Sequence, residues 1–132
     1  MTLVVDASVV VAALVDSGPV GAWCDELLAS EPLAAPHLMH VDVANVLRRA
    51  VMAGDLSADV ASLAHADLLQ VRAALFPYRP LAERVWELRD TVTSDDAWYV
   101  ALAESLAVPL ATLDERVRRA PGTRCEFAAP PR

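Results

Sequence analysis

The 132-residue sequence contains no lysine, and all eleven of its basic residues are arginine. Receiver domains of response regulators need a lysine near the end of the chain, beside acids that bind Mg²⁺ at the edge of a parallel sheet. The missing lysine therefore excludes that class. Aromatic residues are also scarce, at 5% of a sequence that is 55% hydrophobic. We expect a core made mostly of valine, leucine and alanine.

Cysteines and long apolar runs are scarce as well. Cys24 and Cys125 lie far apart in the sequence, and we expect them to be reduced. No spacing of cysteine and histidine fits a zinc site. The apolar run at residues 9–15 is far shorter than the roughly 20 residues that span a bilayer. The N-terminus has an acid at position six and no basic residue, unlike a secretory signal. Together these features predict a cytoplasmic protein.

Positive charge is in the minority, and the formal net charge is −7. This balance argues against a protein that coats nucleic acid non-specifically, because phosphate binding needs a basic surface. It leaves open an enzyme that takes a phosphodiester through cations bound by its carboxylates.

Short runs rich in valine, leucine and alanine alternate with helical patterns along the chain. We expect strands at residues 3–5, 33–35, 74–76, 108–112 and 125–127, and helices at 7–14, 20–30, 38–52, 57–71, 81–89 and 94–106. Ser57 and Ser94 are the expected N-caps of their helices. The alternation predicts an α/β protein with one domain over residues 1–132, folded as a three-layer α/β/α sandwich with a central, mostly parallel sheet.

Four aspartates are expected at one edge of this sheet. Asp6 and Asp114 each follow a predicted strand, Asp96 lies in the first turn of a helix, and Asp42 lies near the start of another. The carboxyl ends of parallel strands form the usual ligand-binding edge, and a helix N-terminus favours an ionised carboxylate. Four carboxylates would repel one another without a cation, and Mg²⁺ prefers oxygen ligands of this kind.

The same residues lie in motifs that resemble those of the PIN domain. The motifs are DAS at residues 6–8, DVANVLRR at 42–49, DAWYVALA at 96–103 and TLD at 112–114. Their order and spacing are similar to those of VapC-type toxins of bacterial toxin–antitoxin pairs, over essentially the whole chain. Two positions depart from the family pattern: Asp42 stands where glutamate is usual, and Asp95 where an aromatic residue is common.

The resemblance implies an endoribonuclease that acts on structured RNA such as tRNA or rRNA. It also implies a homodimer and a small antitoxin that wraps the toxin. Hydrophobic residues at 23–28 and 41–51 would supply an interface for such a partner. In this interpretation Asp6, Asp96 and Asp114 hold Mg²⁺ or Mn²⁺, while Asp42 ligates the metal or orients the attacking water.

Further residues are expected around these four acids. Ser8, Asn45 and Thr112 are candidates to orient the metal ligands by hydrogen bonds, and Asp95 is a neighbouring charge. Arg49 and Arg116 are the candidates for contact with the RNA backbone.

Two other classes of protein share part of this pattern. A haloacid-dehalogenase-type phosphatase needs a second aspartate two residues after the first, and Ser8 occupies that place. A catalytically inactive PIN-like binding or scaffold module is the stronger rival. Acids at all four positions argue against such degeneration.

Overall fold

The computed structural model describes residues 1–130 and is built around a five-stranded parallel sheet with the order β3-β2-β1-β4-β5. The strands are β1 (Leu3–Val5), β2 (Leu33–Pro36), β3 (Ala73–Phe76), β4 (Leu110–Ala111) and β5 (Phe127–Ala128). Val4, in the central strand β1, pairs with Ala34 on one side and with Leu110 on the other. Because all the strands are parallel, their carboxyl ends meet at one edge of the sheet.

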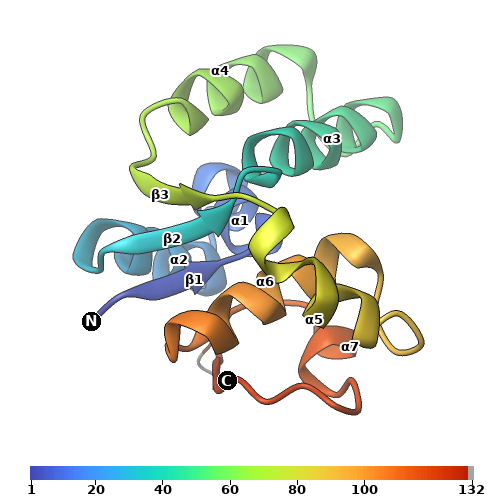
Figure 1. The fold of residues 1–132 in the computed structure, drawn as a ribbon. Helices are drawn as coiled ribbons and strands as arrows, with labels where there is room; N and C mark the ends of the chain where they lie inside the picture. The colour runs from blue at the N-terminus through green and yellow to red at the C-terminus, as the bar shows by residue number, and fades with distance from the viewer. Residues whose placement is uncertain (131–132) are drawn as a thin grey trace.

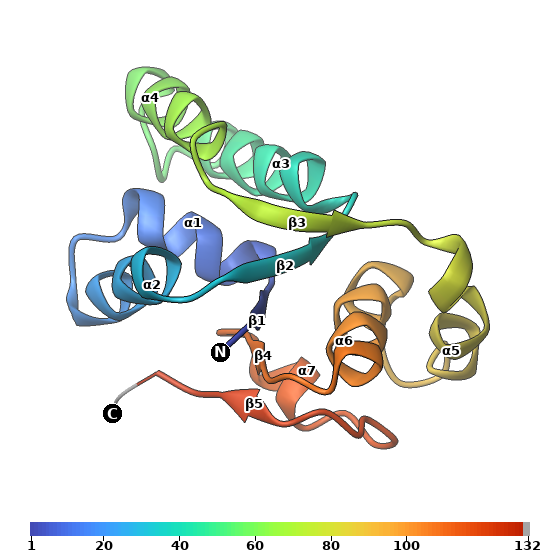
Figure 2. The same ribbon diagram turned by 60° about the vertical axis from the view of Figure 1, so that its left-hand side comes forward.

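Helices cover both faces of the sheet (Figure 1). One face is covered by α1 (Ala7–Val15), α2 (Pro19–Ser30), α3 (Met39–Met52) and α4 (Ala58–Leu68), and the other by η1 (Arg79–Leu81), α5 (Ala82–Glu87), α6 (Ser94–Leu106) and α7 (Glu115–Arg118) (Figure 2). The expected three-layer α/β/α architecture is therefore confirmed. Within residues 1–130 no single helix is long and apolar enough to span a membrane. Helices α1 and α2 reach that length and hydropathy only together, and the pair is bent by 111°.

Alternation along the strands divides the core into two clusters. Leu3 and Val5 of β1 pack with α1 to α4, whereas Val4, between them, packs with α6. This is the side-chain alternation of a strand covered on both faces. The two faces thus have separate hydrophobic cores.

Glycine is required at two positions in the layer formed by α1 to α4. A Cβ on Gly21 would lie 1.9 Å from the backbone oxygen of Asp16, so only glycine allows α2 to start this close to the end of α1. Gly54 follows the C-cap of α3 with a φ of 81°, as expected from its position after the helix.

The helix ends differ from the expected ones for local reasons. Thr93, not Ser94, is the N-cap of α6, because its Oγ1 accepts a hydrogen bond from the Asp96 backbone N–H at 3.3 Å. Ser57 caps α4 as expected. This helix ends at Leu68 rather than near residue 71, since the amides of the next three residues bond to carbonyls three positions back.

Strand β4 starts later than expected, at Leu110, because the residues before it are used otherwise. Ala107 adopts a left-handed conformation with a φ of 55°, and the Val108 amide bonds to the Ala103 carbonyl of α6. Pro109 has no amide to donate. The last strand likewise lies at Phe127–Ala128 instead of residues 125–127.

Candidate active site

All four aspartates identified in the sequence line one cavity of about 230 Å³. They come from separate parts of the chain: Asp6 from the end of β1, Asp42 from α3, Asp96 from α6 and Asp114 from the segment after β4. The other residues of the lining are Ala7, Ser8, Val46, Arg49 and Arg116. Both arginines proposed for RNA contact therefore border the same space as the acids.

Asp6 is the most buried of the four acids, with 6% of its surface exposed. It caps α1: its Oδ1 accepts hydrogen bonds from the Val9 amide at 3.2 Å and from the Ser8 hydroxyl at 2.5 Å. Burial raises the pKa of Asp6 to about 6, and hydrogen bonds from Ser8, Thr112 and Val9 offset part of this effect. The site thus contains a carboxylate whose ionised form gains from a nearby cation.

Asp114 caps the short helix α7 and is paired with an arginine. Its Oδ1 accepts a hydrogen bond from the Arg116 amide at 2.9 Å, and its Oδ2 lies 2.9 Å from Nη2 of the Arg116 guanidinium. The hydrogen bond from the Arg116 side chain lowers the pKa of Asp114. The Thr112 hydroxyl accepts from the Asp114 amide at 3.0 Å and so fixes the backbone of the acid.

Ser8 connects the segment after β1 with the segment after β4. Its hydroxyl donates to Asp6 and accepts a hydrogen bond from the Leu113 amide at 2.9 Å. The segment that carries Asp6 is thereby attached to the segment that carries Asp114.

Asp42 and Asp96 are half-buried acids on helices from the two different layers. Burial raises the pKa of Asp96, as do the charges of Asp114 and Asp42, while the hydrogen bond with Thr93 and the charge of Arg116 lower it. Burial also raises the pKa of Asp42, with a further contribution from Asp95; the hydrogen bond from Tyr99 and the charge of Arg49 act in the opposite direction. The acids of the cavity therefore repel one another.

The carboxylate oxygens that line the cavity are the ligand type that a hard divalent cation prefers. In the described residues they are not arranged as a complete coordination sphere. Within residues 1–130 no three acid, histidine or cysteine side chains are placed together as ligands of one ion. Asp114 is engaged with Arg116, and the carboxylate would have to exchange that partner for a metal. Burial and the charges of Asp114 and Asp42 raise the pKa of Asp96. A cation such as Mg²⁺ or Mn²⁺, which prefers oxygen ligands, would relieve the repulsion between these carboxylates.

The remaining predicted residues differ in whether they lie near the four aspartates. Thr112 is fully buried beneath the site. Asn45 and Asp95 are exposed and lie outside the cavity lining. Sequence reasoning missed Tyr99, whose hydroxyl donates to Asp42 Oδ2 at 3.0 Å. Its position three residues after Asp96 places it on the same face of α6, but this spacing alone does not indicate a bond to Asp42.

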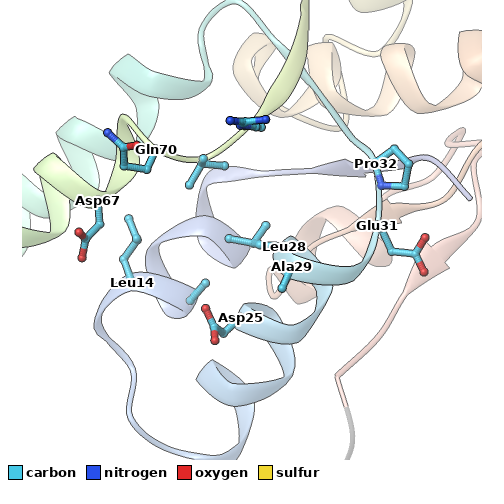
Figure 3. Close-up of a pocket in the computed structure, with 11 residues that line it drawn as sticks. Leu14, Asp25, Leu28, Ala29, Glu31, Pro32, Asp67 and Gln70 are labelled. Atoms are coloured by element: carbon cyan, nitrogen blue, oxygen red, sulfur yellow. The ribbon is translucent and has the colours of Figure 1, made fainter.

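A larger cavity of about 680 Å³ lies at the opposite edge of the sheet (Figure 3). It is bordered by Glu31 and Pro32, just before β2, and by Val71 and Arg72, just before β3. None of the four aspartates at the carboxyl edge borders it. Size alone therefore does not identify the active site.

Comparison with known proteins places this arrangement among nucleases. Residues 3–122 match the PIN domain family. Ribonuclease VapC1 of Mycobacterium tuberculosis is 43% identical over 125 residues, which cover 94% of each chain.

Two solved structures share the fold at low sequence identity. Mycobacterium tuberculosis VapC20, a sarcin-ricin loop cleaving toxin, has a TM-score of 0.66 at 18% identity, covering 88% of this chain and 92% of its own. VapBC2 of Rickettsia felis, bound to a DNA fragment from its promoter, has a TM-score of 0.67 at 12% identity, covering 98% of both chains.

Proposed function

The chain belongs to the PIN domain family, among the relatives of the VapC ribonucleases, and from that premise we propose that it is a Mg²⁺- or Mn²⁺-dependent endoribonuclease. The proposal includes its role as the toxin of a type II toxin–antitoxin pair in the cytoplasm. The family resemblance expected from the sequence is confirmed, and with it the assignment to nucleases.

The observation that carries the proposal is the convergence of four aspartates on one cavity of about 230 Å³. Asp6, Asp96 and Asp114 would hold the cation, with Asp42 ligating it or orienting the attacking water. When bound, the cation lowers the pKa of a water molecule and stabilises the negative charge that develops on the phosphate. The water gives up a proton as it adds to phosphorus, the bond to the leaving oxygen breaks, and that oxygen takes up a proton.

The neighbouring residues hold the acids and receive the RNA backbone. Ser8 fixes Asp6 through its hydroxyl, and Thr112 fixes the backbone of Asp114. Arg49 and Arg116 line the cavity from α3 and α7. In this position the two guanidinium groups would contact phosphates of the bound strand. The sarcin-ricin loop cleaved by VapC20 supports structured RNA as the substrate class.

An apolar groove between α3 and α4 supports the proposal of an antitoxin partner. The groove has a volume of about 410 Å³ and is lined by Ala44, Leu47, Arg48, Val51, Met52, Ala58, Ala61, Ser62 and His65. Met52 and the nearby Leu63 are strongly exposed. Trp23 and Leu28 of α2 instead pack against the core, so this part of the expected partner surface is already used. We assign the α3–α4 groove to an apolar segment of the antitoxin.

Growth experiments test the partner and mass measurements test the dimer. Expression of the chain alone should arrest growth, and co-expression of the small protein encoded beside it should restore growth. Met52→Arg should keep the toxicity but lose the rescue; rescue equal to that of the wild type would overturn the assignment of the groove.

For the homodimer, light scattering should give twice the chain mass of 14.2 kDa.

RNA cleavage by purified protein tests the catalytic proposal against the scaffold alternative. Wild-type protein with Mg²⁺ or Mn²⁺ should cut RNA, and Asp6→Ala and Asp96→Ala should abolish cutting without unfolding the chain. Asp67→Ala, at an exposed acid of α4 far from the four aspartates, is the matched control. Absence of cleavage by the wild type, or equal cleavage by the site variants, would support the scaffold instead.

A further inference from the structure

Tyr99 is a fully buried residue whose only polar atom reaches the active site. Its side chain lies in the core between α6 and the sheet with 1% of its surface exposed. Its hydroxyl donates a hydrogen bond to Asp42 Oδ2 at 3.0 Å.

This hydrogen bond crosses from one layer of the protein to the other. Asp42 belongs to α3, which packs with α1 and α4, whereas Tyr99 belongs to α6 on the opposite face of the sheet (Figure 2). Within residues 1–130 it is the only side-chain hydrogen bond that joins α3 to α6. The position of Asp42 relative to Asp96 therefore depends on this single polar contact and on how the two layers pack.

The same helix supplies both the acid and the support. Asp96 precedes Tyr99 by three residues, so the two side chains lie on neighbouring positions of one helix face. The Tyr99 hydroxyl donates its hydrogen bond to Oδ2 of Asp42, whereas Oδ1 accepts no hydrogen bond in the described part of the chain. One carboxylate oxygen is thus fixed while the other stays available to the cavity that Asp42 lines.

We propose that Tyr99 is a positioning residue of the nuclease, which holds the Asp42 carboxylate in register with Asp96 across the two layers. The inference rests on the proposed function, and it assigns a role to a residue outside the set of acids. An aspartate carboxylate reaches less far from α3 than a glutamate carboxylate would. The phenol fixes the direction of this shorter side chain.

Tyr99→Phe tests the role, because it removes one oxygen and keeps the buried ring. We expect RNA cleavage and the affinity for Mn²⁺, measured by calorimetry without RNA, each to fall about 10- to 100-fold, the range seen when a residue that orients metal ligands is lost. Tyr78→Phe is the matched control, since Tyr78 is partly exposed and makes an edge contact with Trp98. The control should match the wild type in both measurements.

A double-mutant comparison separates positioning from a general loss of stability. In an Asp42→Asn background, Tyr99→Phe should cause no further loss of Mn²⁺ affinity, because the carboxylate through which it acts is already gone. Melting temperatures of all four proteins show whether the chains are folded. An equal loss in both backgrounds, or unchanged cleavage and Mn²⁺ affinity in Tyr99→Phe alone, would overturn the role.

The outcomes also distinguish this inference from the proposed function. If wild type and Tyr99→Phe cleave RNA equally well, the positioning role fails and the nuclease stands. If the wild type cleaves no RNA, the nuclease proposal fails, and the Mn²⁺ affinities of the two proteins decide the role of Tyr99.

Discussion

Arg116 holds both carboxylate oxygens of Asp114: its Nε lies 3.2 Å from Oδ1 and its Nη2 lies 2.9 Å from Oδ2. The guanidinium therefore occupies the place that a cation would take on this acid. Because 88% of the arginine side chain is exposed, it is free to turn away once the metal binds.

From this competition we predict that Arg116→Ala binds Mn²⁺ a few-fold more tightly than the wild type in the absence of RNA. The same variant should bind RNA more weakly, because a phosphate contact is lost. Calorimetry with Mn²⁺ and a filter-binding assay with a non-cleavable RNA measure the two effects. Weaker Mn²⁺ binding by the variant would show that Arg116 supports the metal site rather than competing with it.

Ser8 and Asn45 give a paired prediction about the residues that orient the acids. Ser8 bonds to both Asp6 and the Leu113 amide, so Ser8→Ala should lower Mn²⁺ affinity and cleavage by about 10- to 100-fold. Asn45 is exposed and outside the cavity lining, so Asn45→Ala should stay close to the wild type. An equal loss in the two variants would mean that Asn45 reaches the site when metal or RNA is bound.

The buried carboxylate of Asp6 predicts a pH dependence of stability in metal-free protein. Burial raises its pKa from 3.8 to about 6, so the folded state holds the proton more tightly than the unfolded chain does. The corresponding stabilisation is fully present below about pH 4 and is lost as the pH rises through about 6, by about 3 kcal/mol for two pKa units.

Asp6→Asn keeps the oxygen acceptor but cannot ionise, and it should therefore avoid this loss. Relative to the wild type, its free energy of unfolding should rise between pH 4 and pH 7.5. Urea denaturation in the presence of a chelator measures the difference. A difference that is the same at both pH values would show that Asp6 does not titrate in this range.

Asp42→Glu restores the side-chain length usual in the family, and we predict that it retains or increases RNA cleavage. Initial cleavage rates at saturating Mg²⁺, with Asp42→Asn as the inactive comparison, test this directly. A large loss in Asp42→Glu would mean that the site, including the Tyr99 hydroxyl, has adapted to the shorter aspartate.

Arg84 gives a prediction about stability away from the catalytic residues. Its guanidinium makes two hydrogen bonds to Glu104 of α6, at 2.7 and 3.1 Å, and one to the Gly122 carbonyl at 2.6 Å. Arg84→Ala removes the guanidinium from the half-buried Glu104 carboxylate, which keeps its hydrogen bond from the Arg124 amide, and should lower the free energy of unfolding by about 1–3 kcal/mol. Thermal denaturation measures this, and Arg89→Ala, at an exposed arginine stacked on Trp86, is the control.

The sequence was sufficient to predict the layered fold and the convergence of the four acids at one edge of the sheet, because both depend on local signals. Strand–acid–helix junctions at Asp6 and Asp114 are readable from short stretches, and the parallel arrangement then brings their ends to one edge of the sheet. The motifs added Asp42 and Asp96 through the family resemblance. Details that depend on a choice between adjacent residues were less accessible, as with the N-cap at Thr93 instead of Ser94.

Contacts between the two layers were not accessible in the same way. Tyr99 falls within an apolar helical stretch and gives no local sign that its hydroxyl meets a carboxylate 57 positions earlier. The pairing of Asp114 with Arg116 is similarly a matter of side-chain conformation. Such contacts depend on how α3, α6 and α7 pack, which hydrophobic patterning does not specify.

The hydrogen bond from the Leu113 amide to the Ser8 hydroxyl has a consequence for synthesis of the protein in the cell. A chain emerging from the ribosome carries Asp6 almost from the start, but the Ser8 hydroxyl lacks the Leu113 donor, and the cavity lacks one of its four aspartates, until Leu113 and Asp114 have been made. A prematurely terminated product that lacks this region would therefore have an incomplete set of acids. On the proposed function, RNA cleavage would begin only with nearly complete copies of the chain.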